Sequence, residues 1–161
     1  MDSFLYTAPQ YASDLSLTGG LLIAAVLGAL LGLERSLAGK HAGMRTYALV
    51  SLGSSLFTML SVLSSLQLSF MPGINPLGIA ASIVIGIGFI GSGLAVFRGE
   101  HPVELTTATG IWVAAGVGMA CGFGFYLLAL SATLLGLIIF SFFYKVEKSM
   151  SARFSYNKEK E

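Results

Sequence analysis

The polar residues best able to do chemistry in this sequence stand at the ends of long apolar runs. Glu34 and Arg35 close the first run, and Arg45 opens the second after a short polar segment. If the runs cross a membrane, an unpaired carboxylate at the membrane edge is costly, so Glu34 needs a basic partner. We expect Arg45 to pair with Glu34, and Arg35, one residue further around the helix, to reach lipid phosphates or the neighbouring loop at Glu104 instead.

A second polar segment, residues 98–109, is expected beside the first hairpin on the same face. Thr106 or Thr107 could cap the helix that follows it. Two interpretations stay open at this point, an interfacial salt bridge that fixes the hairpin and a site that reads a partner or ion. The expected cytoplasmic-face polar cluster comprises Glu34, Arg35, Arg45, Thr46, Arg98, Glu104 and Thr106.

Enzyme motifs are missing from the chain. It has no P-loop, no H-E-x-x-H motif and no activated serine or cysteine arrangement, and we expect no enzyme and no cofactor. Its two histidines, His41 and His101, are weak evidence for metal, and no metal site is predicted. The run from Gly86 to Gly91 matches G-x-G-x-x-G, but no acid stands about 20 residues further on. Because that run is also apolar, nucleotide binding is not expected.

Composition points to a membrane protein. Of 161 residues, 55% are hydrophobic and 11% are charged, against roughly 25% charged in soluble domains. The net charge of +1 argues against a nucleic-acid binder, and the apolar content argues against a disordered chain. With so few charged residues, a soluble protein of this size could not cover its surface with polar groups.

The gaps between charges predict an all-α, polytopic membrane protein with five transmembrane helices. A spanning helix needs about 20 residues. The chain has three long uncharged stretches, and in chain order they are long enough for one, two and two such helices. Turn signals at Pro72-Gly73 and Asn75-Pro76, and the glycines of 122–124, divide the longer stretches. The expected spans are 15–34, 46–66, 77–97, 105–121 and 125–144. They form one membrane domain, 15–144, between an external segment, 1–14, and a charged cytoplasmic tail, 145–161.

The basic residues predict the orientation. With five spans, all 9 lysines and arginines fall on one side, in 35–45, in 98–104 and after 144. Because basic loops face the cytoplasm, the N-terminus is expected outside and the C-terminus in the cytoplasm.

Small residues predict how the helices pack, because close backbone approach matters most in lipid. We expect the first four spans to form a tight bundle, with the fifth outside it or at an oligomer contact. Phe140, Phe142, Phe143 and Tyr144 should form an aromatic belt that faces lipid. The expected helix-packing glycines are Gly28, Gly32, Gly86, Gly88, Gly91, Gly93, Gly110 and Gly118.

Three motifs carry a family resemblance. The run from Gly28 to Arg35, continued from Ala42 to Gly53, resembles the first signature of the MgtC/SapB family of membrane proteins. The stretches 86–93 and 105–118 resemble its second and third signatures. The resemblance implies a bacterial inner-membrane protein linked to magnesium limitation, acid stress and virulence. It also suggests a short form, without the ACT-like domain that many members carry at their C-terminus.

The resemblance implies a function carried out through partners. Members are thought to modulate other membrane proteins, and the shortage of charge inside the spans agrees with that role. The alternative is a small transporter or channel for magnesium or another solute. The expected partners are the lipid bilayer, other membrane proteins of unknown identity, and a second copy of the chain as a homodimer. Nucleic acid is not expected.

Overall fold

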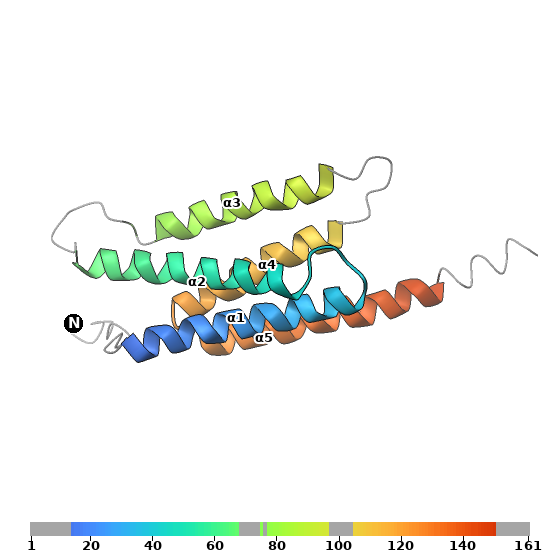
Figure 1. Cartoon of the computed structure of the whole chain (residues 1–161), viewed down its shortest axis with the longest axis horizontal. Helices are drawn as coiled ribbons and strands as arrows, with labels where there is room; N and C mark the ends of the chain where they lie inside the picture. Colours follow the sequence, from blue (N-terminus) through green and yellow to red (C-terminus); the bar gives the residue numbers. More distant parts are fainter. Residues whose placement is uncertain (1–13, 68–74, 76, 97–104, 151–161) are drawn as a thin grey trace, which may run out of the picture.

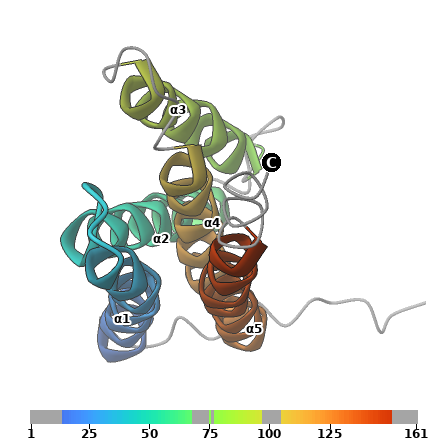
Figure 2. The same ribbon diagram turned by 90° about the vertical axis from the view of Figure 1, so that its right-hand side faces the viewer.

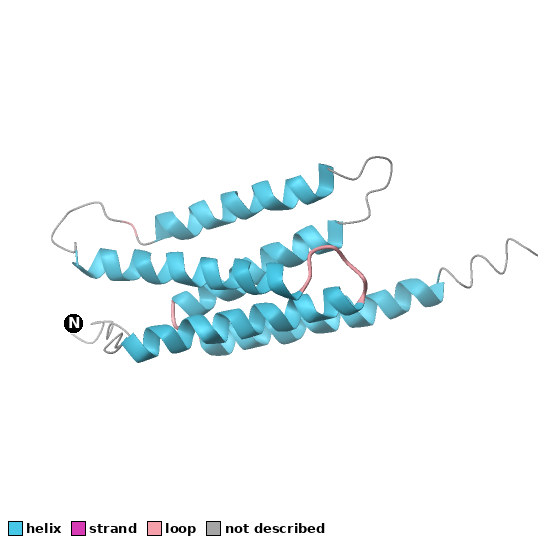
Figure 3. Cartoon of the chain, in the orientation of Figure 1, coloured by secondary structure: helices cyan, strands magenta, loops and turns pink. Residues whose placement is uncertain are grey.

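Five long helices make up the part of the chain that the computed structural model describes, residues 14–67, 75, 77–96 and 105–150 (Figures 1 and 3). Each is long and apolar enough to cross a membrane, the last one over the continuous stretch Tyr126–Met150. The expectation of an all-helical fold with five helices that could span a membrane is therefore confirmed, with boundaries shifted by a few residues. The helices are α1 (Asp14–Leu37), α2 (Met44–Gln67), α3 (Leu77–Val96), α4 (Leu105–Gly122) and α5 (Tyr126–Ile138).

Glycine ends both helices that lead into the short described connections. Gly39 follows α1 with φ of +69°, and Gly124 follows α4 with φ of +82°. In each turn the residue after the glycine donates its backbone N–H to the carbonyl five residues earlier, at 3.0 Å from Lys40 and 2.8 Å from Phe125. This pattern suits glycine because it requires a left-handed residue. The turn predicted at Gly122–Gly124 is confirmed.

Helix α4 lies at the centre of the bundle. It contacts all four other helices, and α1 packs mainly along α2. The view along the bundle shows α1, α2 and α5 around one side of α4, and α3 alone on the other (Figure 2). The expected arrangement is corrected here: α3 is the outlying helix, and α5 packs against α1 and α4.

The last helix changes its winding partway along. After α5, residues Ile139–Phe143 form a π-helix, and α-helix then continues to Met150. A π-turn inserts an extra residue into the helical repeat, so side chains on either side of it lie at a different angle around the axis. The whole unit, Tyr126–Met150, runs past the connection between α1 and α2 and ends beyond it (Figure 1). We call that end of the bundle the hairpin end.

Candidate functional site

A buried arginine lies at the hairpin end of α1. Arg35 is 3% exposed, and its guanidinium forms an ion pair with the carboxylate of its neighbour Glu34, which is itself only partly exposed. The expected Glu34–Arg45 pair is absent among the described residues, where Arg45 is exposed and makes no ion pair. The expectation that Arg35 reaches lipid phosphates is also wrong. Glu34 does have a basic partner, as expected, but that partner is its neighbour Arg35 and not Arg45.

Phe140 holds the other side of the arginine. It belongs to the π-helix that follows α5, and its ring lies under the guanidinium of Arg35, 4.1 Å from ring centre to Cζ. A cation over an aromatic face is stabilised by the ring quadrupole, most of all where water is excluded. Phe140 is 7% exposed, so it does not belong to the lipid-facing belt, whereas Phe142, Phe143 and Tyr144 are more than half exposed.

A tyrosine joins α2 to α4 next to this pair. Tyr47 is fully buried and donates its hydroxyl to the backbone carbonyl of Thr107 at 3.0 Å. Gly110 leaves room for it, because a Cβ there would overlap the Tyr47 hydroxyl and lie 2.6 Å from Cζ of Phe140. The tyrosine, the phenylalanine and the start of α4 therefore meet at one point. We call Glu34, Arg35, Tyr47, Thr107, Gly110 and Phe140 the inner cluster.

One hydroxyl of the inner cluster has no partner. The side chain of Thr107 is 1% exposed, and its Oγ1 makes no hydrogen bond among the described residues. Its expected role as a capping residue at the start of α4 is not what the structure shows. A buried hydroxyl without a partner is costly, and such groups mark places where water or a ligand group can be taken up.

Below the inner cluster, α2 presents a face of hydroxyls to α1 and α4. Ser51 donates to the backbone carbonyl of Ala24 on α1 at 2.7 Å. A Cβ at Gly28 would lie 2.6 Å from the carbonyl oxygen of Tyr47, and one at Gly118 would overlap the carbonyl of Ser51. The three backbones therefore approach as closely as glycine permits. Other buried hydroxyl side chains on this face are Ser54, Ser55, Thr58 and Ser61.

The glycines of α3 do not take part in such contacts. A Cβ added at Gly86, Gly88 or Gly93 would meet no atom within 4 Å, and at Gly91 it would make only an ordinary contact with Ala108 at 3.7 Å. The prediction of close helix approach at these positions is therefore wrong for the described part of the chain. Gly32 and Gly110, by contrast, face backbone and side-chain atoms closer than 3.0 Å.

The remaining members of the expected polar cluster lie apart from the buried pair. Arg45 and Thr106 are exposed, and Thr46 is half-buried. No hydrogen bond or ion pair joins them to Glu34 among the described residues. Arg98, Glu104 and His101 fall outside the described residues, and His41 is exposed.

Sequence reasoning missed the inner cluster as a unit. The expectation that Phe140 faces lipid is wrong, and Tyr47 lies within the motif run 42–53 without a predicted role. A signal was present in the small residues, because Gly110 opens the stripe that continues through Ala114 and Gly118. A stripe of this kind predicts a large side chain or a backbone opposite it. It does not say which residue fills the space.

The arrangement can hold a buried positive charge and offer a hydroxyl beside it. Within the described ranges, no three histidine, cysteine, aspartate or glutamate side chains gather as metal ligands would. The chemistry of the inner cluster is thus hydrogen bonding and charge pairing between helices. The inner cluster connects α1, α2, α4 and the π-helix through the contact of Arg35 with Phe140 and the hydrogen bond from Tyr47 to Thr107.

Comparison with known proteins gives a consistent result. A family model described as the MgtC family matches residues 21–149. A protein of Escherichia coli (strain K12) named "Putative magnesium transporter YhiD" is 38% identical over 128 residues, which cover 78% of this chain and 60% of the relative. Protein MgtC of Salmonella typhimurium (strain LT2) is 42% identical over 115 residues, which cover 71% of this chain and 47% of the relative.

The length covered differs between the chain and its relatives. An uncharacterized protein of Haemophilus influenzae, 35% identical over 140 residues, is covered over 59% of its length. The chain thus spans about half to three fifths of the curated relatives it matches. No solved structure matches it.

Proposed function

The chain belongs to the MgtC family of membrane proteins, and we propose that it is a non-enzymatic protein of the bacterial inner membrane that modulates partner membrane proteins. The processes proposed are magnesium homeostasis, acid stress or virulence. The exposed polar residues at the hairpin end, among them Arg45 and Thr106, are the proposed contact points for a partner. The buried pair Glu34–Arg35 is proposed to hold that end of the bundle in shape.

One observation carries the choice of a regulator over a transporter. At the hairpin end, the carboxylate of Glu34 is already paired with the buried guanidinium of Arg35 and is not free to bind a metal ion. Mg²⁺ prefers carboxylate and water oxygens in octahedral geometry. Below this ion pair, α1, α2 and α4 are in backbone contact at Gly28 and Gly118. A path for Mg²⁺ between these three helices would have to open those contacts.

The proposed orientation places the hairpin end in the cytoplasm. Lys40 and Arg45 lie at this end, and α5 brings Lys145 and Lys148 to it. The excess of basic residues supports the assignment through the positive-inside rule. Reporter fusions after residues 40 and 150 should read cytoplasmic, and a fusion after 73 should read external. A cytoplasmic reading at 73 would contradict both the orientation and the five-span topology.

A transporter is the second candidate, because one relative carries the name "Putative magnesium transporter YhiD". The decisive experiment is a flux assay on purified protein in liposomes that contain a fluorescent Mg²⁺ indicator. We expect Mg²⁺ entry no faster than in protein-free liposomes. Saturable entry that Arg35→Gln changes would reverse the choice between the two candidates.

The regulator proposal needs a positive test as well. A photo-crosslinking residue placed at Arg45 should capture a specific membrane protein in cells under magnesium limitation. The same residue at Leu134, an exposed position in the middle of α5, serves as the control for unspecific neighbours. Equal capture at both positions would count against a partner site at the hairpin end.

A further inference from the structure

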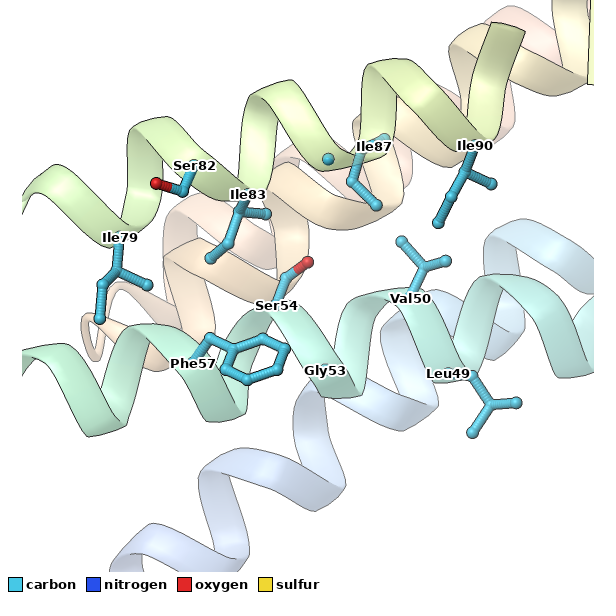
Figure 4. Close-up of a pocket in the computed structure, with 11 residues that line it drawn as sticks. Leu49, Val50, Gly53, Ser54, Phe57, Ile79, Ser82, Ile83, Ile87 and Ile90 are labelled. Atoms are coloured by element: carbon cyan, nitrogen blue, oxygen red, sulfur yellow. The ribbon is translucent and has the colours of Figure 1, made fainter. Parts of the chain in front are cut away.

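The apolar space between α2 and α3 has a volume of about 660 Å³ and no charged side chain among the described residues that line it (Figure 4). Its polar side chains are those of Ser54 and Ser82. The buried charge of the described bundle lies elsewhere, at the hairpin end, where the guanidinium of Arg35 covers the ring of Phe140. This contact joins α1 to the π-helix.

The packed face of the last helix ends at Phe140. Ala129 and Thr133 are buried on this face, and Phe140 follows seven residues after Thr133, so all three share one side of an α-helix. From residue 141 to residue 150 every side chain is exposed. The segment 144–150 can therefore turn about its axis without breaking a buried contact within the described part of the chain.

The winding of residues 139–143 decides which side chains continue this face beyond Phe140. In an uninterrupted α-helix, the residues four and seven positions after Phe140 would do so, and these are Tyr144 and Glu147. The π-turn adds one residue to the repeat, so Lys145 and Lys148 take those positions. A change from π- to α-winding therefore exchanges two lysines for a tyrosine and a glutamate on this side of the helix.

The inner cluster supports the π-turn through Phe140. A π-helix is rare, occurs mostly as a single turn within an α-helix and is frequent at functional sites. Here the ring of Phe140 has the guanidinium of Arg35 at 4.1 Å on its face, and its Cζ lies where a Cβ at Gly110 would come within 2.6 Å. A change of winding would begin with the release of this ring.

Glu34 gives the outside of the bundle access to this contact. The side chain of Glu34 is 17% exposed, whereas that of Arg35 is 4% exposed. A buried cation that loses its partner is costly. A group that takes the Glu34 carboxylate away from Arg35 would therefore draw the arginine toward water and away from Phe140.

We propose that the contact of Arg35 with Phe140 holds the π-turn, and that its release returns residues 139–143 to α-winding and turns the segment 144–150 by about 100°. The inner cluster and the exposed end of the last helix then form one conformational device. Its release changes the charge on the side that follows Phe140 from positive to negative. This inference does not rest on the proposed function, because it concerns how the hairpin end is coupled to the last helix.

Double electron–electron resonance between two spin labels measures such a rotation. One label is attached to Ser149→Cys on the last helix, and the other to Leu30→Cys on α1 or, in a second sample, to Leu60→Cys on α2. All three positions are exposed. Cys121 is replaced by serine in every sample. Because a helix with its side chains is about 10–12 Å across, a turn of about 100° moves the first label by roughly 8 Å.

Four variants test the contact itself. Arg35→Gln should change at least one of the two distances by more than about 4 Å, half of that displacement. Phe140→Leu keeps an apolar side chain without the ring and should give the same change, also where Arg35→Gln does not fold. Glu34→Gln should move part of the population in the same direction. Arg45→Gln, which removes an exposed cation of the hairpin end, should change neither distance.

Deletion of Ser141 separates rewinding from a general loosening of the bundle. Removal of one residue from the π-turn leaves an α-helix in which the following side chains keep their wild-type direction. This variant should fold, keep both wild-type distances and keep them when Arg35→Gln is added. Deletion of Leu134, in the α-helical part, turns Phe140 away from the bundle and should lower the melting temperature, which makes it the matched control.

Three results would overturn the proposal. The first is unchanged distances in both Arg35→Gln and Phe140→Leu, because the π-turn would then not depend on their contact. The second is a Ser141 deletion that does not fold or that shifts the label. The third is a change of distance when Arg35→Gln is added to the Ser141 deletion, which would assign the motion to loosening and not to the winding.

Discussion

Helices α3 and α4 are both rich in glycine, and they use it in opposite ways. In α4, Gly110, Gly118 and Gly122 would each bring an added Cβ within 3.0 Å of α2 atoms. In α3, Gly78, Gly86, Gly88 and Gly93 face no atom within 4 Å. Spacing does not explain the difference. Gly110 and Gly118 are eight positions apart and share a face of α4, but Gly78 and Gly86 are also eight positions apart and share a face of α3.

The two helices also differ in how much of them is buried. Half of Leu105–Gly122 in α4 is buried, against 11% of Leu77–Leu94 in α3. Glycine content alone therefore does not predict close helix contact in a membrane protein. A repeat that keeps small residues on one face permits such contact but does not ensure it, because the stripe of α4 meets α2 while Gly78 and Gly86 of α3 meet no described atom. Four variants test this contrast between tightly packed and open parts of the bundle.

The largest effect is expected at the α2–α4 contact. Gly118→Ala would place a Cβ on the backbone carbonyl of Ser51, which cannot move as a side chain can. We expect a loss of about 3 kcal/mol in the free energy of unfolding, the upper end of the usual cost of overpacking. Thermal unfolding in detergent, followed by circular dichroism, measures it. Gly116→Ala on the same helix meets nothing within 4 Å and should keep or raise the melting temperature. Equal melting temperatures for the two variants would contradict the assigned contact.

The buried ion pair should give the next effect. Arg35→Met leaves the carboxylate of Glu34 without its partner and removes the cation from the ring of Phe140. Because Glu34 is partly exposed, we expect about 2 kcal/mol rather than the 3–5 kcal/mol typical of a fully buried pair. Adding Glu34→Gln should recover part of the loss, which a double-mutant cycle measures. A strictly additive cycle would show that the two side chains do not act as a pair.

A smaller effect is expected at the hydrogen bond between α2 and α4. Tyr47→Phe keeps the buried ring and removes the hydroxyl that donates to the Thr107 carbonyl. The loss should be about 1 kcal/mol, the usual value for one hydrogen bond. Tyr144→Phe provides the control, because Tyr144 is 52% exposed. If both variants have the melting temperature of the wild type, the hydrogen bond does not stabilise the bundle.

The smallest effect is expected on α3. Gly88→Ala adds a methyl group to open surroundings and improves helix propensity, so stability should be unchanged or rise by up to about 1 kcal/mol. Chemical unfolding in mixed detergent measures differences of this size. A loss above 1 kcal/mol would mean that a surface absent from the single chain packs on Gly88, as a second copy would.

The sequence allowed the spans to be predicted because charge and hydropathy act along the helix axis. Runs without charge and turn residues such as Gly124 set where each helix begins and ends, and these positions were within a few residues of those observed. The partner of Glu34 could not be predicted in the same way. The identity of that partner depends on the rotation of each helix around its axis and on which helices face each other. A local sequence pattern predicts neither.

The inner cluster was partly within reach of the sequence. Phe140 stands 7 residues after the buried Thr133 and 11 after the buried Ala129, a spacing that keeps all three on one face of an α-helix. The sequence has no pattern that marks 139–143 as a π-helix, and it does not say which side chain lies opposite Phe140. Its neighbours Phe142, Phe143 and Tyr144 are exposed, as expected of a lipid-facing belt, whereas Phe140 is buried. Proximity in sequence said little about which side of the helix each ring would occupy.

Helix α2 packs against α4, although α3 lies between them in the chain. This order has a consequence for biosynthesis. Helices leave the ribosome in chain order, so α2 enters the membrane before α4 exists. Its hydroxyl-bearing face, with Ser55 and Thr58 fully buried in the finished bundle, then meets only α1 and lipid. A variant that slows the insertion of α4 prolongs that stage, in which α2 is open to the wrong neighbour and to membrane proteases. Steady-state abundance in cells should therefore depend on α4 more steeply than the stability of the finished protein does.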